Sequence, residues 1–168
     1  MDIQIDNEAA GDQTQIHQVT KQAFLQAAHT SHTEHFIVDA LRRAGALTIS
    51  QVAKVNGEII GHVALSPVTI SSGVRGWYGL GPVSVLPDYQ RRGVGSKLIK
   101  SSLGMLKAMG ASGCVVLGEP AYYSRFGFTA VDGLTLPDVP AEYFLALTFD
   151  QTFPQGEVSY HHAFSAQD

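Results

Sequence analysis

Cysteine is nearly absent from this chain of 168 residues, in which Cys114 is the only one. A single cysteine excludes an intrachain disulfide and suits a reducing compartment. Basic residues are also scarce: 11 Lys and Arg stand against 15 Asp and Glu, and the formal net charge is −4. That balance excludes the broad basic face that binds nucleic acid. The first residues, MDIQIDNEAAGDQ, lack the apolar run of a signal peptide, and no apolar stretch is long enough to span a bilayer. We therefore expect a cytoplasmic protein with no nucleic-acid and no membrane partner.

A metal site is not expected either. His29, His32 and His35 recur every three residues, but a spacing of four suits a helical ligand pair better, and no Cys or Asp cluster accompanies them. We expect solvated histidines there, with Glu34 on the same solvated face. Cys114 begins an apolar strand with no His partner nearby in sequence, which favours a buried, inert thiol.

The length and an apolar fraction of 45% predict one domain over residues 1–168. Alternating or β-branched apolar residues favour strands, and apolar residues at helical spacing favour helices. Asn56-Gly57 is a hairpin signal between two of the strands. The connection that leaves the central strand, passes through a helix and enters the fifth strand gives a parallel pair. The expected strands cover 2–6, 47–55, 58–70, a central strand that Trp77 and Tyr78 open and that runs to 86, 115–119, 143–149 and 156–164. The expected helices cover 11–27, 33–44, 96 to about 109, and 120–125, with 134–142 irregular.

The chain is organised around residues 80–96, LGPVSVLPDYQRRGVGS, which are typical of a strand, a turn and the start of a helix. Gly93 and Gly95 allow backbone N–H groups to close around an anion, and the helix N-terminus adds about half a positive charge. Arg91 and Arg92 add full charges. The stretch therefore predicts a site for a phosphate or diphosphate.

Two common phosphate motifs fail on this stretch. The dinucleotide fingerprint G-x-G-x-x-G needs a third glycine where Leu98 stands. The P-loop needs Lys directly after its last glycine, and Ser96 follows Gly95. What fits is Q-x-x-G-x-G after a V-x-V strand and a proline.

That pattern resembles the coenzyme A motif of the GNAT-type N-acetyltransferase superfamily. A second element, Tyr123-Ser124-Arg125-Phe126-Gly127-Phe128, resembles the family's Y-x-x-x-G-F element and follows at the expected distance. The whole segment LGEPAYYSRFGF resembles the YhbS-like branch of the family.

The resemblance implies a mixed α/β fold: a mostly antiparallel sheet with helices on both faces, whose central strands splay apart to admit the pantetheine arm of acetyl-CoA as an extra strand. Pro82 suits a bulged or splayed strand, because proline cannot donate to a ladder. Tyr123 matches the general acid that protonates the departing thiolate. The residues implied to hold the cofactor are Val83, Ser84, Val85, Gln90, Arg91, Arg92, Gly93, Val94, Gly95 and Ser96.

The general base is open on sequence grounds. Glu119, at the end of the fifth strand, can relay a proton from an ammonium group through water, or it can be a helix-start carboxylate stabilised by the helix dipole. One departure from the family concerns the fifth strand, where many members carry an Asn that binds the pantetheine arm. This chain reads VVLGEPA there.

The sequence therefore predicts an acyltransferase that moves an acetyl group from acetyl-CoA, its co-substrate, to an amine by direct attack, without a metal. The expected acceptor is a small-molecule or peptide amine. The sequence leaves open whether the protein forms a homodimer. Two alternatives also remain: a catalytically idle coenzyme A-binding or sensing module, and an acyltransferase that uses longer acyl chains or an acyl-carrier partner.

Overall fold

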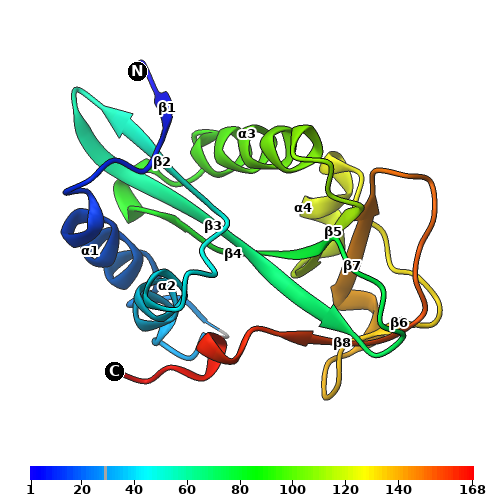
Figure 1. Cartoon of the computed structure of the whole chain (residues 1–168). Coiled ribbons are helices and arrows are strands. Elements are labelled where there is room, and N and C mark those ends of the chain that lie inside the picture. Colours follow the sequence, from blue (N-terminus) through cyan, green and yellow to red (C-terminus); the bar gives the residue numbers. More distant parts are fainter. Residues whose placement is uncertain (29) are drawn as a thin grey trace.

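The chain forms one twisted sheet flanked by helices, and Figure 1 shows it as a computed structural model that describes residues 1–28 and 30–168. The strands pair in the order β1-β2-β3-β4-β5-β7, with only β4 and β5 parallel along this path. Strand β8 pairs with the far end of β3, and β6 pairs with β8. The strands are β1 (Gln4–Asn7), β2 (Ile49–Val55), β3 (Glu58–Ile70), β4 (Trp77–Val85), β5 (Gly113–Leu117), β6 (Leu134–Thr135), β7 (Phe144–Thr148) and β8 (Gly156–Tyr160), and the helices are α1 (Gln13–Phe24), α2 (Glu34–Arg43), α3 (Val94–Ala108) and α4 (Pro120–Tyr123).

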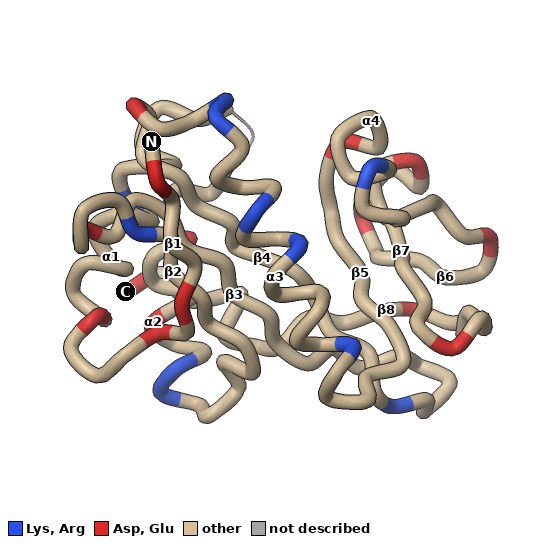
Figure 2. The backbone as a smooth tube through the Cα atoms, turned by 90° about the horizontal axis from the view of Figure 1, so that it is seen from above, with Lys and Arg blue, Asp and Glu red and all other residues tan. Residues whose placement is uncertain are grey.

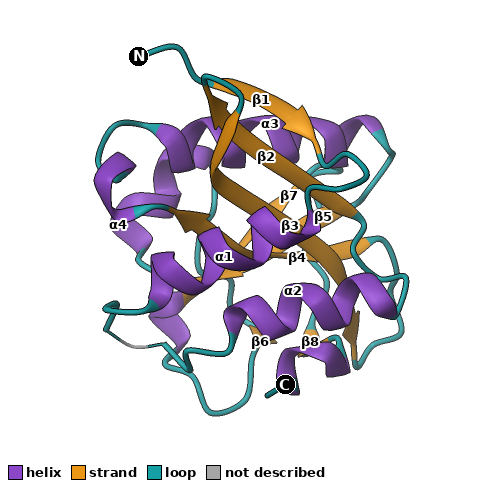
Figure 3. Cartoon of the chain, turned by 90° about the vertical axis from the view of Figure 1, so that its left-hand side faces the viewer, coloured by secondary structure: helices purple, strands orange, loops and turns teal. Residues whose placement is uncertain are grey.

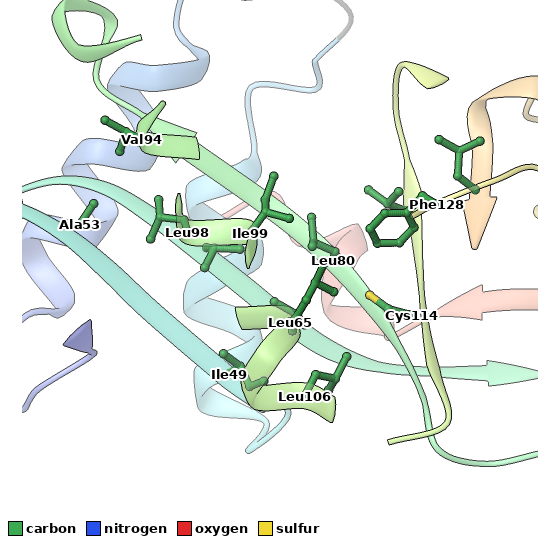
Figure 4. Packing of buried hydrophobic residues seen from close by; sticks show 14 of the residues in the cluster. Ile49, Ala53, Leu65, Leu80, Val94, Leu98, Ile99, Leu106, Cys114 and Phe128 are labelled. Carbon is green, nitrogen blue, oxygen red and sulfur yellow. The ribbon is translucent and has the colours of Figure 1, made fainter. Parts of the chain in front are cut away.

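Helices cover both faces of the sheet, which confirms the predicted fold class. Figure 3 shows α1 and α2 across one face and α3 on the other. Ile16 of α1 and Val38 of α2 pack with Val52 of β2 on the first face. Leu98 and Leu106 of α3 belong to the largest apolar cluster, on the second face, shown in Figure 4. In the described part of the chain, no helix is long and apolar enough to cross a membrane.

Several element ends differ from the sequence prediction. Helix α1 ends at Phe24 and does not reach residue 27, because Leu25 continues the apolar spacing but is 62% exposed and belongs to none of the apolar clusters. The last strand ends at Tyr160, and the 3-10 turn His162–Ser165 follows, where the His161 ring accepts a hydrogen bond from the backbone N–H of Ala163. The short β6 lies inside the segment expected to be irregular. The Asn56-Gly57 hairpin is confirmed.

The two central strands separate along their length. Strands β4 and β5 pair at only three positions, the last being Gly79 with Val115, whereas β4 continues to Val85. Between the β3–β4 pairs Leu65–Leu80 and Val63–Val83, one residue of β3 faces two of β4, Gly81 and Pro82. This bulge stands where proline predicts it. Figure 2, seen from above, shows β4 and α3 on one side of the separation and β5, β7 and α4 on the other.

The histidine prediction is wrong in one position. His35 is only 6% exposed, and its ring packs against Phe36 and edge-on against His17, so it is a core residue of the α1–α2 pair. Burial and the nearby His17 charge lower the pKa of His35. The prediction that Glu34 lies on a solvated face is also wrong, because one of its carboxylate oxygens is buried. His29 lies outside the described residues, and among those described no group of three or more His, Cys, Asp or Glu side chains is arranged to hold a metal.

Candidate functional site

The turn after β4 reverses the chain directly into α3. Arg91 (φ 63°) and Gly93 (φ 83°) both adopt the left-handed conformation, and Gly93 stands at the N-cap of α3. Glycine reaches that conformation without a Cβ penalty. The Gln90 side-chain amide donates a hydrogen bond to the Val85 carbonyl at 3.0 Å and so ties the turn to the end of β4. The free N–H groups of the first turn of α3 therefore lie beside the strand end, where they can bind an anion.

A cavity of about 370 Å³ lies at this turn and brings both sequence motifs together. Arg92 is not part of its lining: its guanidinium carbon lies 5.9 Å from the Tyr89 ring centre instead. The cavity is lined by Val85, Tyr89, Gln90, Arg91, Gly93, Val94, Gly95, Ser96, Tyr122 and Arg125.

Sequence reasoning missed three residues of this lining: Tyr89, which directly precedes the predicted turn, and Tyr122 and Arg125. Tyr122 and Arg125 come from α4 and the 3-10 turn after it, and the Arg125 guanidinium carbon lies 4.5 Å from the Tyr122 ring centre. The signal was present, because Arg125 is the one cation inside the Y-S-R-F-G-F element. Arg91 and Arg125 thus approach the cavity from two elements that are far apart in sequence, and with the α3 N-terminus they make it suited to a diphosphate.

A larger cavity, of about 720 Å³, adjoins the same turn. The last turn of α1 and the residues just after it, Leu25 among them, form one wall, and residues 86–90 form the other. Among the described residues that line it, Asp88 alone is charged, so their chemistry does not match a diphosphate, and the smaller cavity is the better anion site.

Beyond Gly79, strand β4 presents toward β5 backbone groups that no other strand pairs with, and of these the Val85 carbonyl accepts from the Gln90 side chain. The Leu86 N–H donates to the Ile60 carbonyl of β3 at 2.9 Å. Because residues of an antiparallel strand alternate in the side to which their backbone groups point, Ser84 also faces β3, whereas Val83 and Val85 face the gap. An extended ligand chain can pair with these two residues. The Ser84 side chain is buried, with no hydrogen-bond partner for its hydroxyl among the described residues.

Tyr123 is held by ring contacts at the β5 side of the gap. Its ring lies 5.0 Å from that of Tyr122 and 5.9 Å from that of Phe128, centre to centre. A Cβ on Gly118 would lie 2.3 Å from the Tyr123 ring, so only glycine allows this close approach. Burial, with smaller contributions from Tyr122 and Cys114, raises the pKa of Tyr123 to about 12. The phenol is therefore protonated at neutral pH and available as a donor.

Glu119 lies at the N-cap of α4, between β5 and Tyr123. Its backbone carbonyl accepts hydrogen bonds from the N–H groups of Tyr122 and Tyr123, but its side chain is exposed and does not cap the helix. Cys114 is buried, and burial raises the pKa of its thiol, as expected of an inert thiol. The carboxylate of Glu119 is thus free to act in solvent beside the gap.

A partly buried polar chain that runs from α2 across β2 to β3 was not foreseen. Arg42 of α2 donates to Glu8 at 2.6 Å, the Ser50 hydroxyl donates to the same carboxylate at 2.7 Å, and the His62 Nε2 lies 2.8 Å from Ser50 Oγ. Burial opposes ionisation of Glu8, but hydrogen bonds from Arg42 and Ser50 outweigh it and lower the pKa of Glu8. Because the Glu8 carboxylate only accepts, Ser50 must donate to it and accept from His62, which fixes the Nε2–H tautomer of His62.

His62 makes the stability of the fold depend on pH. Burial lowers the pKa of His62 to about 4, below the value of about 6.5 in an unfolded chain. Its stabilising contribution is therefore complete above pH 6.5 and is lost as the pH falls toward 4, by up to about 3 kcal/mol in the free energy of unfolding. Urea titrations between pH 4 and 7.5 measure this dependence. His62→Gln should flatten it, whereas substitution of the exposed His32 by Gln should leave it unchanged; equal slopes in all three proteins would contradict the assignment.

Comparisons with known proteins agree with this geometry. A family described as "Acetyltransferase (GNAT) domain" matches residues 46–130. The Escherichia coli protein YhbS, described as an uncharacterized N-acetyltransferase, is 38% identical over 107 residues, which are 63% of this chain and 64% of the E. coli protein. The matched region thus spans less than two thirds of that relative.

Solved structures extend the match to nearly the whole chain. A GNAT family acetyltransferase from Brucella melitensis, in complex with acetyl-CoA, is 48% identical with a TM-score of 0.87, covering 97% of this chain and 98% of the other. YhbS from E. coli in complex with CoA is 30% identical with a TM-score of 0.87, covering 97% and 92%. These two structures share the fold of this chain over nearly its whole length. The chain belongs to the GNAT acetyltransferase family, and to its YhbS-like branch.

Proposed function

We propose that this protein is an acetyl-CoA-dependent N-acetyltransferase that transfers the acetyl group directly to an amine. The observation that carries the proposal is the open edge of β4 beyond the Gly79–Val115 pair, with a cavity suited to a diphosphate at its outer end. That combination matches a long cofactor with an anionic head and an extended arm. The complexes of the B. melitensis and E. coli relatives with acetyl-CoA and CoA support it.

The binding residues act from the turn and from the strand. Gln90 holds the turn in place, and Gly93, Val94, Gly95 and Ser96 offer backbone donors at the helix N-terminus. Arg91 and Arg125 neutralise the diphosphate charge from two sides of the cavity. Val83 and Val85 pair with the pantetheine arm, whereas Ser84 faces the other way and pairs with His62 of β3.

The reaction replaces a carbon–sulfur bond by a carbon–nitrogen bond. The amine nitrogen attacks the thioester carbonyl carbon and loses one proton, and the sulfur departs as a thiolate that takes its proton from water. Tyr123 donates a hydrogen bond to that sulfur, and its raised pKa keeps the donor in place at neutral pH. Glu119, exposed beside the gap, accepts the proton of the amine through water.

A cationic amine suits the β5 side of the molecule. Between Gly113 and Tyr160 there is one basic residue, Arg125, whereas the basic residues of the turn and of α3 lie across the gap (Figure 2). A negative potential on one wall raises the local concentration of a protonated amine. The acidic residues of this segment are Glu119, Asp132, Asp138, Glu142, Asp150 and Glu157.

The test is a thiol-release assay with acetyl-CoA across polyamines, amino acids, aminoglycosides and peptides, with mass spectrometry of the acceptor. The proposal predicts thiol release that depends on one amine class and yields an N-acetylated product. Cofactor binding without turnover on any acceptor would favour an idle coenzyme A-binding module. Faster turnover with long-chain acyl-CoA than with acetyl-CoA would favour a different acyl donor.

The two neighbouring arginines of the turn should differ in effect. Arg91→Ala should weaken binding of CoA and reduce its dependence on salt, because an exposed charge that contacts a phosphate is screened over about 8–10 Å near physiological ionic strength. Arg92→Ala, the matched control, should change neither, since its side chain lies toward Tyr89 and outside the cavity lining. Calorimetric titrations with CoA at low and high salt measure both. Equal losses in the two variants would place the phosphates outside the cavity.

A further inference from the structure

A tyrosine of the last strand, Tyr160, lies against the inner end of the gap between β4 and β5. It pairs with Val68 of β3 across the ladder, yet its ring extends past β3 to β4. A Cβ on Gly79 would lie 2.4 Å from its Cε1 and 2.9 Å from its Cδ1. Gly79 is the last residue of β4 that pairs with β5. The absence of a side chain at Gly79 is thus what brings the phenol to the point where the strands part.

The electrostatic surroundings place the phenol near β5 as well. Burial raises the pKa of Tyr160, and Cys114 of β5 and Tyr123 of α4 raise it further. Cys114 precedes Val115, the partner of Gly79. The Tyr160 hydroxyl is therefore protonated at neutral pH and is a hydrogen-bond donor.

The two tyrosines approach the gap from opposite faces of the sheet. Tyr160 packs with the apolar cluster of Val115 and Trp77, whereas Tyr123 packs with the cluster of Cys114 and Val116 on the α3 face. Tyr160 is held firmly, because the Phe164 ring lies 4.9 Å from its own, centre to centre. Two donors on opposite faces can contact two different atoms of one ligand group between them.

A buried hydroxyl lies on the same face as Tyr160. Ser66 of β3 pairs with Gly79, and side chains of a directly opposed pair project from the same face. Its hydroxyl is fully buried and finds no hydrogen-bond partner among the described residues. The inner end of the gap thus gathers polar groups within an otherwise apolar cluster, which indicates a site for a polar ligand group.

The length of the free edge indicates which ligand group reaches this point. From Val85 at the diphosphate cavity to Gly79 the strand covers six residues, about 20 Å at ~3.3 Å per residue. An arm that starts at the cavity and pairs with Val85 and Val83 therefore brings its acyl end toward Gly79. This step rests on the proposed function.

We propose that the Tyr160 hydroxyl donates a hydrogen bond to the carbonyl oxygen of the acetyl group of bound acetyl-CoA. Tyr123 then donates a hydrogen bond to the departing sulfur from the α3 face, and Tyr160 donates one to the oxygen from the opposite face. A donor fixed in advance at the oxygen stabilises the negative charge that develops there during attack. Phenylalanine at position 160 keeps the ring contacts with Gly79 and Phe164 and removes only the donor.

The test compares two ligands in three proteins. CoA and acetyl-CoA are titrated calorimetrically into the wild type and Tyr160→Phe, with Tyr143→Phe, a 37%-exposed tyrosine, as the matched control. Tyr160→Phe should bind acetyl-CoA about three- to tenfold more weakly, as expected for one net hydrogen bond, with CoA affinity unchanged. Its rate of acetyl transfer should fall by about 100-fold, as for loss of one oxyanion donor.

A spectroscopic signature complements the titrations. With acetyl-CoA labelled with ¹³C at the acetyl carbonyl, the bound resonance in the wild type should lie downfield of the free ligand and return toward it in Tyr160→Phe. Equal affinities and equal resonances in both proteins would overturn the inference, as would an equal loss of CoA and acetyl-CoA binding. A wild type that binds neither ligand would instead overturn the proposed function itself.

Discussion

Replacement of Tyr123 by Phe should lower kcat and kcat/KM together, by about 10- to 10,000-fold, while CoA binds as before. The hydroxyl of Tyr123 acts only when the sulfur departs, so its loss affects the transition state and not the bound cofactor. Burial raises its pKa to about 12. A phenol of this pKa is a weaker acid than an ordinary tyrosine, and we expect it to act by donating a strong hydrogen bond rather than by complete proton transfer. The kinetics are measured with the best acceptor of the thiol-release assay.

The stability of the same variant separates catalysis from packing. Tyr123→Phe keeps the ring contacts with Phe128 and the close approach to Gly118, so the free energy of unfolding should change by no more than about 1 kcal/mol. Tyr143→Phe, at an exposed position, should leave both activity and stability unchanged. Full activity in Tyr123→Phe would remove it as the donor to sulfur. A large fall in melting temperature with a matching loss of activity would indicate a purely structural tyrosine.

Replacement of Gly95 by Val should raise the Kd for CoA by at least about 100-fold, which is about 2.7 kcal/mol. A Cβ at this position would lie 3.4 Å from the Tyr122 hydroxyl oxygen and 3.9 Å from Val85 Cγ2. The methyl groups of valine must then extend into the cavity or push against its walls. Calorimetric titration with CoA measures the loss.

The matched control for Gly95→Val lies on the same helix. Gly104 has nothing within 4 Å of the position of a Cβ, so valine is accommodated there. Gly104→Val should bind CoA like the wild type, and both variants should melt cooperatively. Unchanged affinity in a folded Gly95→Val protein would mean that the diphosphate binds elsewhere.

The sequence predicts what is local and leaves open what depends on distant segments. The Asn56-Gly57 hairpin, the turn at Gly93 and the bulge at Pro82 follow from backbone preferences of single residues, and each is present. The end of α1 was placed too late because the apolar spacing continues through Leu25, although Leu25 is mostly exposed. The spacing of apolar residues predicts a helix, but which of these side chains become buried depends on the segments that pack against them.

The sequence predicted the part of the candidate site that lies in its two motifs. The turn at residues 90–96 was identified from its glycines, and Tyr123 from the second motif, but the contribution of Arg125 appears only when α4 lies against the turn. Tyr160 comes from a strand that pairs with the far end of β3, and only Gly79 lets its ring pass. In the sequence, His62 is a polar residue that interrupts an apolar strand. In the structure, Ser50 of the neighbouring strand connects it by hydrogen bonds to Glu8. Such pairings between distant segments have no signature in one sequence.

The central claim concerns where acetyl-CoA lies, and a crystal structure of the complex tests it most directly. The account predicts the diphosphate in the cavity between Arg91 and Arg125, and the arm paired with Val83 and Val85. The acetyl group should lie between the hydroxyls of Tyr123 and Tyr160. Cofactor density in the larger cavity beside Leu25, with the edge of β4 left free, would contradict it.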